Sequence, residues 1–310
     1  MEALLILALA LLLDWGLGEP PRYLHPVVAM GKVAAALERV APRRGRAAPL
    51  LYGTVAALLV AALFSIPSYL LLDWLRGWNA IVYVIAGAVL LKSTFSLRQL
   101  LSEALNIRDR LRRGEVGRAR HDLRALVSRD TSELSPELIA SAAVESAAEN
   151  TPDSFVSPLV FFLLLGVPGA MAYRVVNTLD AMWGYHGRYE YLGKFVARLD
   201  DLLNLVPARV AALLLAAAAP LSGGSARSAL RVLWRDRSLT ASPNAGWPMA
   251  AAAGALRVRL EKVGHYRLGD NHYPLTPETI DRAAGLVRVA ALFWVVVALT
   301  VLGVRFALET

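Results

Sequence analysis

The chain has 310 residues, of which 56% are hydrophobic, and it carries a net charge of +8 at neutral pH. Such a hydrophobic content is typical of a protein that crosses a membrane several times and argues against a soluble domain. The absence of cysteine excludes disulfides, thiolate metal sites and cysteine nucleophiles. No nucleic-acid recognition motif accompanies the arginine-rich charge. We therefore expect no nucleic-acid partner and attribute the charge to anionic lipid head groups and phosphorylated substrates.

Apolar segments bounded by polar residues predict four membrane spans. These lie at about 1–17, 50–72, 77–91 and 289–304. The turn between the second and third spans is predicted at Asp73 to Arg76. Two more apolar segments, 155–173 and 208–221, are expected to be embedded in the membrane or to span it.

Arginine-rich segments flank the second and third spans, at 32–46 and 92–154. The positive-inside rule places both in the cytoplasm. The expected fold is an all-α, polytopic integral membrane protein that forms a single membrane-embedded domain over residues 1–310. We expect it to contain re-entrant or partly embedded helices and a cytoplasmic helical region at about 92–154.

Polar residues follow the first span directly. Asp14, Glu19 and His25 lie there among glycines and prolines. Carboxylates at the end of a membrane helix favour a loop that lines a functional site. Taken alone, His25 is more typical of a structural histidine than of a ligand.

Carboxylates and amides are concentrated in the middle of the chain. Ser135 and the proline after it predict the start of a helix that ends at Asn150, and Glu145 and Glu149 share one face of that helix. Ionisable residues near lipid are costly and are usually functional. Any one of these carboxylates could instead be a solvated helix end.

Two further helical patches repeat this pattern. Asn177 and Asp180 share a helix face, and Asp200 and Asn204 form an i, i+4 pair with Asp201 beside them. Such oxygen-bearing groups suit Mg²⁺, which usually completes its shell with water and substrate phosphates. We therefore hypothesise that the patches converge on one cation, although the aspartates could also pair with nearby arginines.

The segment 155–173 decides whether the patches can meet. If it crossed the membrane, Glu145 and Asp180 would lie on opposite sides. Gly166 to Gly169 is typical of a turn between two half-length helices. We predict a re-entrant or partly buried hairpin, which a membrane protein tolerates where protein covers the backbone.

A turn at Ser242 to Pro248 opens into a helix predicted at Met249 to Leu260. Free backbone amides at such a helix start can hold a phosphate. A plain junction between a turn and a helix remains the alternative. The polar segment Val263 to Asp281 is predicted to be a surface loop without metal-ligand spacing.

Several longer motifs resemble one family. They are DWGLGEPPRYLHPVVAMG, ENTPDSFVSPL, NTLDAMWGY, YLGKFVARLDDLLNLVPAR and SPNAGWPMAAAAGALRVRL. Together, from Asp14 to about Gly269, they resemble the adenosylcobinamide-phosphate synthase family of cobalamin biosynthesis (CobD/CbiB). The resemblance implies a ligase of the inner cell membrane whose active site faces the cytoplasm. It would use ATP and Mg²⁺ to join the free propionate of adenosylcobyric acid to (R)-1-amino-2-propanol or its O-phosphate. A homo-oligomer, or a complex with other late corrinoid enzymes, is left open.

We assign roles by charge and spacing. Mg²⁺ ligation is assigned to Asp180, Asp200 and Asp201. Catalytic roles are assigned to Glu145, Glu149, Asp153 and Asn177, with Glu145 or Asp153 acting as base or second metal ligand. Substrate and phosphate binding is assigned to Asp14, Glu19, His25, Asn150, Tyr185, Lys194, Arg198, Arg209, Ser242, Asn244 and Gly246.

Two other functions remain as alternatives. The aspartates resemble the Mg²⁺-diphosphate motifs of membrane prenyltransferases, but this chain has too few full spans for the barrel of those enzymes. A non-enzymatic membrane sensor or scaffold, as in a related regulatory family implicated in β-lactamase induction, would not depend on the acidic cluster.

Overall fold

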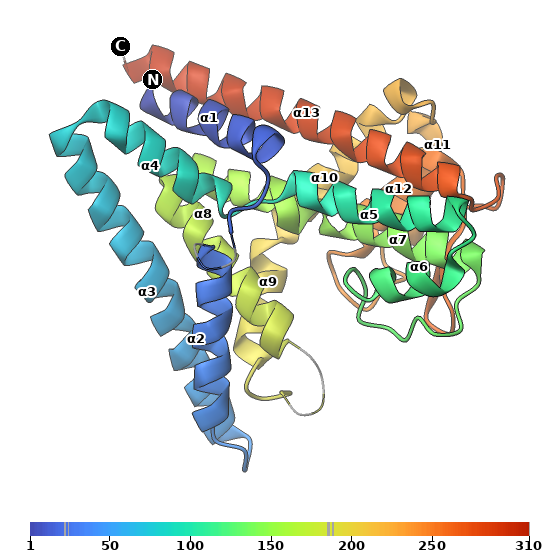
Figure 1. The fold of residues 1–310 in the computed structure, drawn as a ribbon, viewed down its shortest axis with the longest axis horizontal. Helices are drawn as coiled ribbons and strands as arrows, with labels where there is room; N and C mark the ends of the chain where they lie inside the picture. Colours follow the sequence, from blue (N-terminus) through green and yellow to red (C-terminus); the bar gives the residue numbers. More distant parts are fainter. Residues whose placement is uncertain (22, 24, 185–186, 188, 310) are drawn as a thin grey trace. The chain divides into compact units, whose positions relative to one another are not determined.

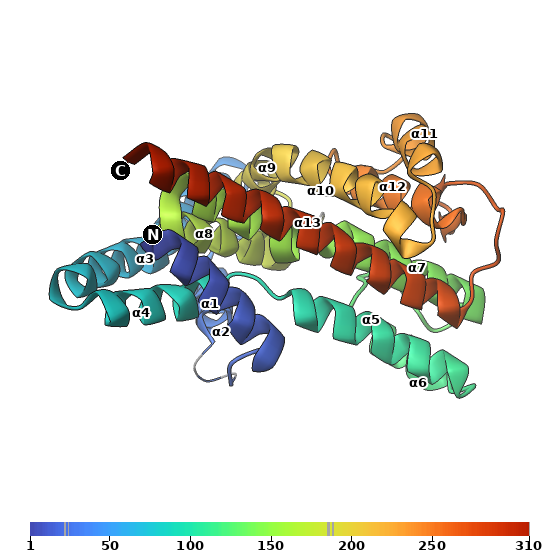
Figure 2. The same ribbon diagram turned by 90° about the horizontal axis from the view of Figure 1, so that it is seen from above.

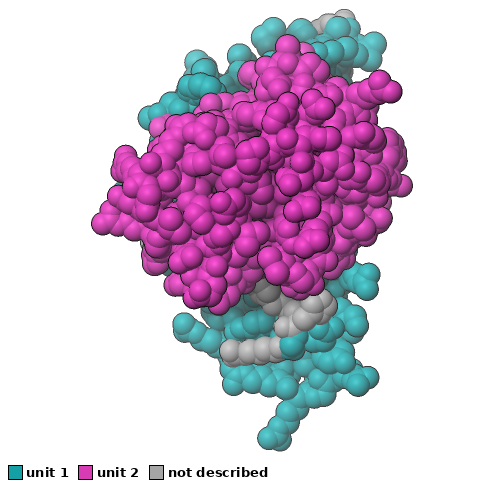
Figure 3. Space-filling model, turned by 90° about the vertical axis from the view of Figure 1, so that its right-hand side faces the viewer, with its two compact units in different colours: residues 1–96, 157–204, 298–310 teal, residues 97–156, 205–297 magenta. Residues whose placement is uncertain are grey.

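The computed structural model describes residues 1–21, 23, 25–184, 187 and 189–309 (Figure 1). The fold is all-α, as predicted, and the described chain adds one small two-stranded sheet. The chain divides into two compact units (Figure 3). Unit 1 comprises Met1–Ser96, Ser157–Asn204 and Ala298–Thr310, and unit 2 comprises Leu97–Val156 and Leu205–Val297.

Among the described residues, four helical stretches are long and apolar enough to cross a membrane: 47–78, 80–112, 136–183 and 277–308. A fifth is added if the bent pair 194–203 and 205–218 counts as one span. These stretches include the predicted segments 50–72 and 289–304, and 80–112 includes all of the predicted segment 77–91 except its first three residues. The first helix has only 15 residues, about 22 Å at 1.5 Å per residue, which is shorter than a typical hydrocarbon core.

In its described residues, unit 1 is built from six helices and the end of a seventh. They are α1 (Glu2–Gly16), α2 (Pro26–Val40), α3 (Ala47–Trp78), α4 (Ala80–Lys92), α8 (Ser157–Trp183), α9 (Lys194–Leu203) and the last part of α13 (Pro277–Glu309). Helix α8 contacts α2, α3, α4 and α9. Its apolar face, with Val175, Leu179 and Trp183, packs against Ala57 of α3 and Val196 of α9 to form the core. Helix α8 therefore organises this unit.

The turn predicted at Asp73 to Arg76 is wrong, because α3 continues as a helix to Trp78. Trp74 and Trp78 stack one helical turn apart with ring centroids 5.8 Å from each other. The reversal occurs at Asn79, whose side-chain Oδ1 accepts from the backbone N–H groups of Ile81 and Val82 at 2.8 and 3.1 Å. An asparagine N-cap, and not the charged residues before it, thus sets this turn.

Helix α8 folds back on itself at Gly166, which has φ 69° and ψ −164°. The rings of Phe161 and Tyr173 stack across this break with centroids 5.1 Å apart. A straight helix would separate them by about 18 Å. The helical fold-back predicted here is confirmed, and its depth in a membrane stays a prediction.

An arginine from the last helix completes this hairpin. The Arg305 guanidinium donates to the backbone carbonyl of Leu163, just before the break. A carbonyl at this position loses its helical partner where the helix stops. Arg305 therefore satisfies an oxygen that the fold-back exposes.

Unit 2 contains the remaining elements (Figure 2). They are α5 (Leu97–Arg112), α6 (Val116–Leu123), α7 (Pro136–Thr151), a π-helical turn (Pro152–Val156), α10 (Leu205–Ala218), a 3₁₀ turn (Pro220–Ser222), α11 (Ala226–Asp236), α12 (Gly246–Leu256), β1 (Leu260–Lys262), β2 (Tyr266–Leu268) and the first part of α13. Helix α12 contacts α7, α10 and α11. Its alanines let these helices approach closely, so most of α12 is buried.

Two boundaries in unit 2 test the sequence predictions. Ser135 caps α7, with its Oγ accepting from the N–H of Leu138 at 3.4 Å, as predicted. The helix predicted at Met249 to Leu260 instead ends at Leu256, because Arg257 adopts a left-handed φ of 59°. The segment predicted to be a surface loop contains β2, which pairs antiparallel with β1. This hairpin carries Tyr266 toward α7.

Candidate functional site

The acidic cluster of unit 1 lies where α8 ends and α9 runs. Asp180 belongs to α8, and Asp200 and Asp201 belong to α9. The Asp180 carboxylate lies close enough to Asp200 and Asp201 for electrostatic repulsion. Three of the sequence-predicted metal residues are therefore brought into one neighbourhood.

Two amides fix the Asp200 carboxylate. Asn204 Nδ2 donates to Asp200 Oδ2 at 3.0 Å, and Asn177 Nδ2 lies 3.4 Å from Oδ1. The buried Asn204 Oδ1 accepts from Ser157 Oγ at 2.7 Å and from Tyr173 OH at 2.9 Å. Asn204 thus links the two arms of the α8 hairpin to the acidic cluster. The sequence predicts Asn204 in the same helical patch as Asp200, and the structure shows that its amide orients that carboxylate.

Glycines shape the chain around Asp180. A Cβ at Gly184 would lie 2.2 Å from Asp180 Oδ1, and a Cβ at Gly193 would lie 1.8 Å from the Trp183 carbonyl oxygen. Neither position has room for a side chain. The close approach of these backbones holds the end of α8 against the start of α9.

The number of carboxylates that can reach one ion decides how well the acidic cluster of unit 1 suits Mg²⁺. Across the described residues, no group of three or more His, Asp or Glu side chains is arranged to hold a metal ion by itself. Mg²⁺ commonly takes one or two carboxylates and completes its shell with water and phosphate oxygens. Asp200 and its neighbours fit that smaller contribution, and a cation would relieve the repulsion among the three aspartates.

Cationic and polar groups lie around this cluster. Arg198 interacts electrostatically with Asp201, and Arg174 Nη1 lies 3.4 Å from Asn177 Oδ1. Lys194, at the exposed start of α9, has its Nζ 5.7 Å from the centroid of the Tyr191 ring. Tyr185, predicted to bind substrate, lies outside the described residues.

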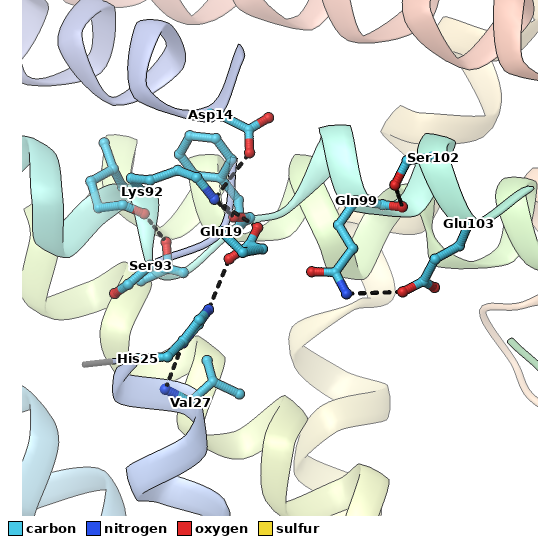
Figure 4. Close-up of polar contacts among 12 residues, drawn as sticks. Asp14, Glu19, His25, Val27, Lys92, Ser93, Gln99, Ser102 and Glu103 are labelled. Carbon is cyan, nitrogen blue, oxygen red and sulfur yellow. Dashed lines mark hydrogen bonds and ion pairs between the residues drawn. The ribbon is translucent and has the colours of Figure 1, made fainter. Parts of the chain in front are cut away.

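The loop after α1 forms a second polar network in unit 1 (Figure 4). Lys92 Nζ lies 3.0 Å from Asp14 Oδ1 and donates to Glu19 Oε1 at 2.8 Å. Glu19 Oε2 accepts from His25 Nε2 at 2.8 Å, while His25 Nδ1 accepts from the N–H of Val27. These contacts assign the imidazole proton to Nε2. The loop residues predicted from sequence do meet, and they do so around a lysine that we did not predict.

The charged groups of this network are buried or half-buried, so each of them depends on its partners within the protein. The Lys92 side chain is 5% exposed and that of Asp14 is 8% exposed. Burial tends to raise the pKa of Glu19, but the hydrogen bonds from His25 and Lys92 outweigh it and hold the pKa below its usual value. His25 also caps α2 through its Nδ1. Its observed contacts are therefore those of a structural histidine.

Glu145 is the centre of the site in unit 2. Its Oε1 accepts from Ser141 Oγ at 2.6 Å, and its Oε2 accepts from Tyr266 OH at 2.9 Å and from Arg129 at 3.2 Å. Ser141 Oγ in turn accepts from the backbone N–H of Glu261 at 2.9 Å. Both oxygens of this buried carboxylate are thus occupied by protein donors.

Burial and the nearby Glu145 charge raise the pKa of Tyr266 well above its ordinary value. Its hydroxyl therefore stays protonated and donates to the carboxylate. Neither Arg129 nor Tyr266 was predicted from sequence, because nothing local marks a residue that pairs with a distant helix. Glu145 is consequently better suited to hold the site together than to accept a proton.

Glu149 differs from Glu145 although the two share a face of α7. It is exposed, and it interacts electrostatically with Glu145, Lys262 and Arg129. Asn150 Nδ2 donates to the Ser146 carbonyl, one turn earlier on the same helix, at 2.9 Å. Asp153 lies in the π-helical turn, half-buried. Of the acidic residues predicted on this helix, Glu149 is the one that solvent or a ligand reaches.

The predicted phosphate segment is also in unit 2. Arg209 Nη1 donates to Asn244 Oδ1 at 2.8 Å, which brings two of the predicted residues together. However, Ser242 Oγ already accepts from the N–H groups of Asn244 and Ala245 at 3.2 and 3.3 Å. The prediction of free amides at this helix start is therefore wrong for these two groups. Gly246 begins α12.

Comparison with known proteins decides the family. A family model described as CobD/CbiB protein matches residues 7–287. A relative from Dehalococcoides mccartyi (strain CBDB1), named cobalamin biosynthesis protein CobD, is 51% identical over 302 residues, covering 97% of this chain and 98% of that protein. The chain belongs to the CobD/CbiB family.

Other CobD/CbiB relatives come from distant organisms. A protein from Methanothermobacter thermautotrophicus named probable cobalamin biosynthesis protein CobD is 44% identical, covering 87% of this chain and 88% of its own length. A protein from Klebsiella pneumoniae named cobalamin biosynthesis protein CobD is 38% identical, covering 93% and 94%. No solved structure matches the chain. The CobD/CbiB match, over residues 7–287, contains every residue of the three networks above.

Proposed function

We propose that this protein is a cobalamin biosynthesis ligase of the cell membrane. It would amidate the free propionate of adenosylcobyric acid with (R)-1-amino-2-propanol or its O-phosphate, using ATP and Mg²⁺. The observation that carries this proposal is the family match over residues 7–287. The acidic cluster of unit 1 supports it, because phosphoryl transfer depends on charge neutralisation and positioning.

The reaction has two chemical requirements. The propionate oxygen first attacks the γ-phosphorus of ATP, so that ADP leaves and an acyl phosphate forms. The amine nitrogen then attacks the acyl carbon, phosphate leaves, and the ammonium proton passes to a base. The chain must therefore supply groups that hold phosphate and a group that accepts a proton.

Asp180, Asp200 and Asp201 are the groups that we assign to Mg²⁺. The bound ion would neutralise phosphate charge. Asn177 and Asn204 fix the orientation of Asp200 through their side-chain amides. Such outer contacts matter because they set where the ligand oxygens point. Lys194 and Arg198 on the same helix are assigned to phosphate.

We assign proton removal to Glu149 in unit 2. A general base needs a free carboxylate oxygen that reaches the substrate. Glu149 is exposed, whereas both oxygens of Glu145 accept bonds from Ser141, Tyr266 and Arg129. Glu145 is then a positioning residue that holds Arg129 and Tyr266 beside the base. Asp153 remains a second acidic candidate.

Charge distribution supports a cytoplasmic site in the inner membrane. In the sequence, arginines follow α2 just before the hairpin made by α3 and α4, and further arginines follow that hairpin in α5 and α6. The turn of the hairpin has only Arg76. The positive-inside rule therefore places the ends of α3 and α4 distant from Asn79 in the cytoplasm. ATP and the corrinoid would be available on that side.

Product formation by purified protein tests the function. The assay supplies ATP, Mg²⁺ and adenosylcobyric acid, with and without aminopropanol or its phosphate, and measures ADP and the mass of the corrinoid. We expect ADP release that requires the corrinoid, together with a new amide. Folded, lipid-supplemented protein without corrinoid-dependent turnover would favour a sensor or scaffold function.

A further inference from the structure

Two arginines and two tryptophans form a compact cluster in unit 2. The guanidinium carbons of Arg209 and Arg237 lie 4.5 and 5.4 Å from the centroid of the Trp247 ring. Arg237 also lies 4.6 Å from the centroid of Trp234, and the two indoles meet edge to face at 5.7 Å. Both guanidinium groups therefore contact the same indole ring.

These two cations have no carboxylate partner in the part of the chain that the structure describes. Arg209 donates to the Leu205 carbonyl and to Asn244 Oδ1, and Arg237 donates to the Trp234 carbonyl. All of these acceptors are uncharged. Half-buried arginines close to the same ring repel each other, and an anion placed between them would remove that repulsion.

Neighbouring arginines on α11 behave differently. Arg231 and Arg235 both pair with Asp270, at 2.9 and 2.8 Å. Their charge is neutralised within the protein. The contrast within one short stretch of chain shows that Arg237 is not simply another solvated arginine of an amphipathic helix.

The cluster is held in place by a close backbone contact. A Cβ at Gly246 would lie 2.1 Å from the carbonyl oxygen of Arg237. Glycine lets the start of α12 press against the end of α11, which sets Trp247 beside Arg237. The packing of these two helices thus fixes Arg237 against Trp247, as a binding site requires.

We propose that Arg209 and Arg237, stacked on Trp247 and Trp234, bind the phosphoryl group of a phosphate-bearing ligand. Guanidinium groups offer several donors in a plane that suits phosphate oxygens. The ligand is a soluble phosphate, such as a nucleotide, or the head group of an anionic lipid. For a soluble ligand, this inference deepens and rests on the proposed function, since it adds Arg237 and both tryptophans to Arg209.

Equilibrium binding to full-length protein in maltoside detergent tests the site. The probes are pyrophosphate, ATP without Mg²⁺, and short-chain phosphatidylglycerol, with short-chain phosphatidylcholine as the uncharged comparison. Calorimetry gives the affinity, and tryptophan fluorescence reports on the indoles. We expect Arg237→Gln and Arg209→Gln each to lower the binding affinity for an anionic probe at least tenfold. We expect Trp247→Phe to reduce the change in tryptophan fluorescence on binding.

Arg231→Gln is the matched control, because that arginine lies on the same helix and is already paired with Asp270. We expect the affinity of this variant for each anionic probe to stay within twofold of that of wild type. Where Arg237→Gln does not fold, Arg237→Lys keeps the charge and should retain part of the affinity. If Arg209→Gln and Arg237→Gln lose affinity only for pyrophosphate and ATP, the ligand is a soluble phosphate. If they lose affinity only for phosphatidylglycerol, the ligand is a lipid.

Equal affinities in wild type, Arg209→Gln and Arg237→Gln, or no binding of any anionic probe by folded wild type, would overturn the proposal. The assay needs no turnover, so its outcome is separate from that of the ligase assay. A protein that forms the amide but binds phosphate equally well without Arg237 would keep the proposed function and lose this inference.

Discussion

Phe161 and Tyr173 stack with ring centroids 5.1 Å apart across the break at Gly166, although both belong to α8. The fold-back depends on the backbone of that glycine, whose φ of 69° and ψ of −164° lie in a region that is essentially restricted to glycine. The hairpin also orients Asn204, since Ser157 and Tyr173 donate to the same oxygen from its two arms.

Gly166→Ala should therefore destabilise the protein, by about 1–3 kcal/mol. Thermal unfolding in detergent measures the change. Gly303→Ala is the matched control, because Gly303 lies within α13 and a Cβ there meets nothing within 4 Å. We expect that substitution to be neutral or slightly stabilising. Equal stability of Gly166→Ala and wild type would contradict the fold-back.

Lys92→Met should lower stability far more than the loss of an exposed lysine. It leaves Asp14 and Glu19 without their shared cation in a buried setting, which costs about 3–5 kcal/mol. Arg76→Met provides the comparison, because Arg76 pairs with Glu2 at 2.9 Å but its side chain is 63% exposed. That change should cost about 0–1 kcal/mol. Similar losses in the two variants would show that the Lys92 network is not buried.

The lowered pKa of Glu19 predicts a dependence of stability on pH. Because the folded protein favours the ionised carboxylate, Glu19 contributes stability above the ordinary carboxyl pKa of 4.5. That contribution is lost as pH falls through the depressed pKa. Unfolding followed from pH 7 down to the acid range should show a smaller loss of stability in Glu19→Gln than in wild type. Parallel curves would contradict the assignment.

Glu149→Gln should reduce kcat strongly, by about 10²- to 10⁴-fold, if Glu149 removes the amine proton. Its KM for the corrinoid should change little. Glu137→Gln, an exposed change in the first turn of the same helix, should leave kcat near wild type. Corrinoid amide formation under saturating ATP gives both parameters. A Glu149→Gln enzyme with wild-type kcat would transfer the role to another acid, with Asp153 the next to test.

Asp201→Ala should abolish turnover at an Mg²⁺ concentration that saturates wild type, because it removes one of the three carboxylates assigned to the ion. Raising Mg²⁺ should restore part of the rate. The control is Asp73→Ala, since Asp73 is exposed on α3. Near-normal activity of Asp201→Ala in a folded sample would remove this residue from the metal site.

The sequence alone was a good guide wherever the signal was local. Hydrophobic composition predicted the helical membrane class, Ser135 predicted the start of α7, and the glycines near 166 predicted the fold-back. Each of these features depends on a few neighbouring residues and on intrinsic backbone preferences. The turn after α3 lies at Asn79 and not at the charged residues before it, because the asparagine side chain caps the start of α4.

Which chemical groups share a helix face follows directly from the amino-acid sequence, because spacing along a helix fixes its faces. What those groups do to one another follows from the tertiary packing. Lys92 pairs with both Asp14 and Glu19. Arg129 and Tyr266 donate hydrogen bonds to Glu145, whereas Glu149 stays exposed. Such pairings depend on packing between segments distant in sequence, and no local pattern encodes them.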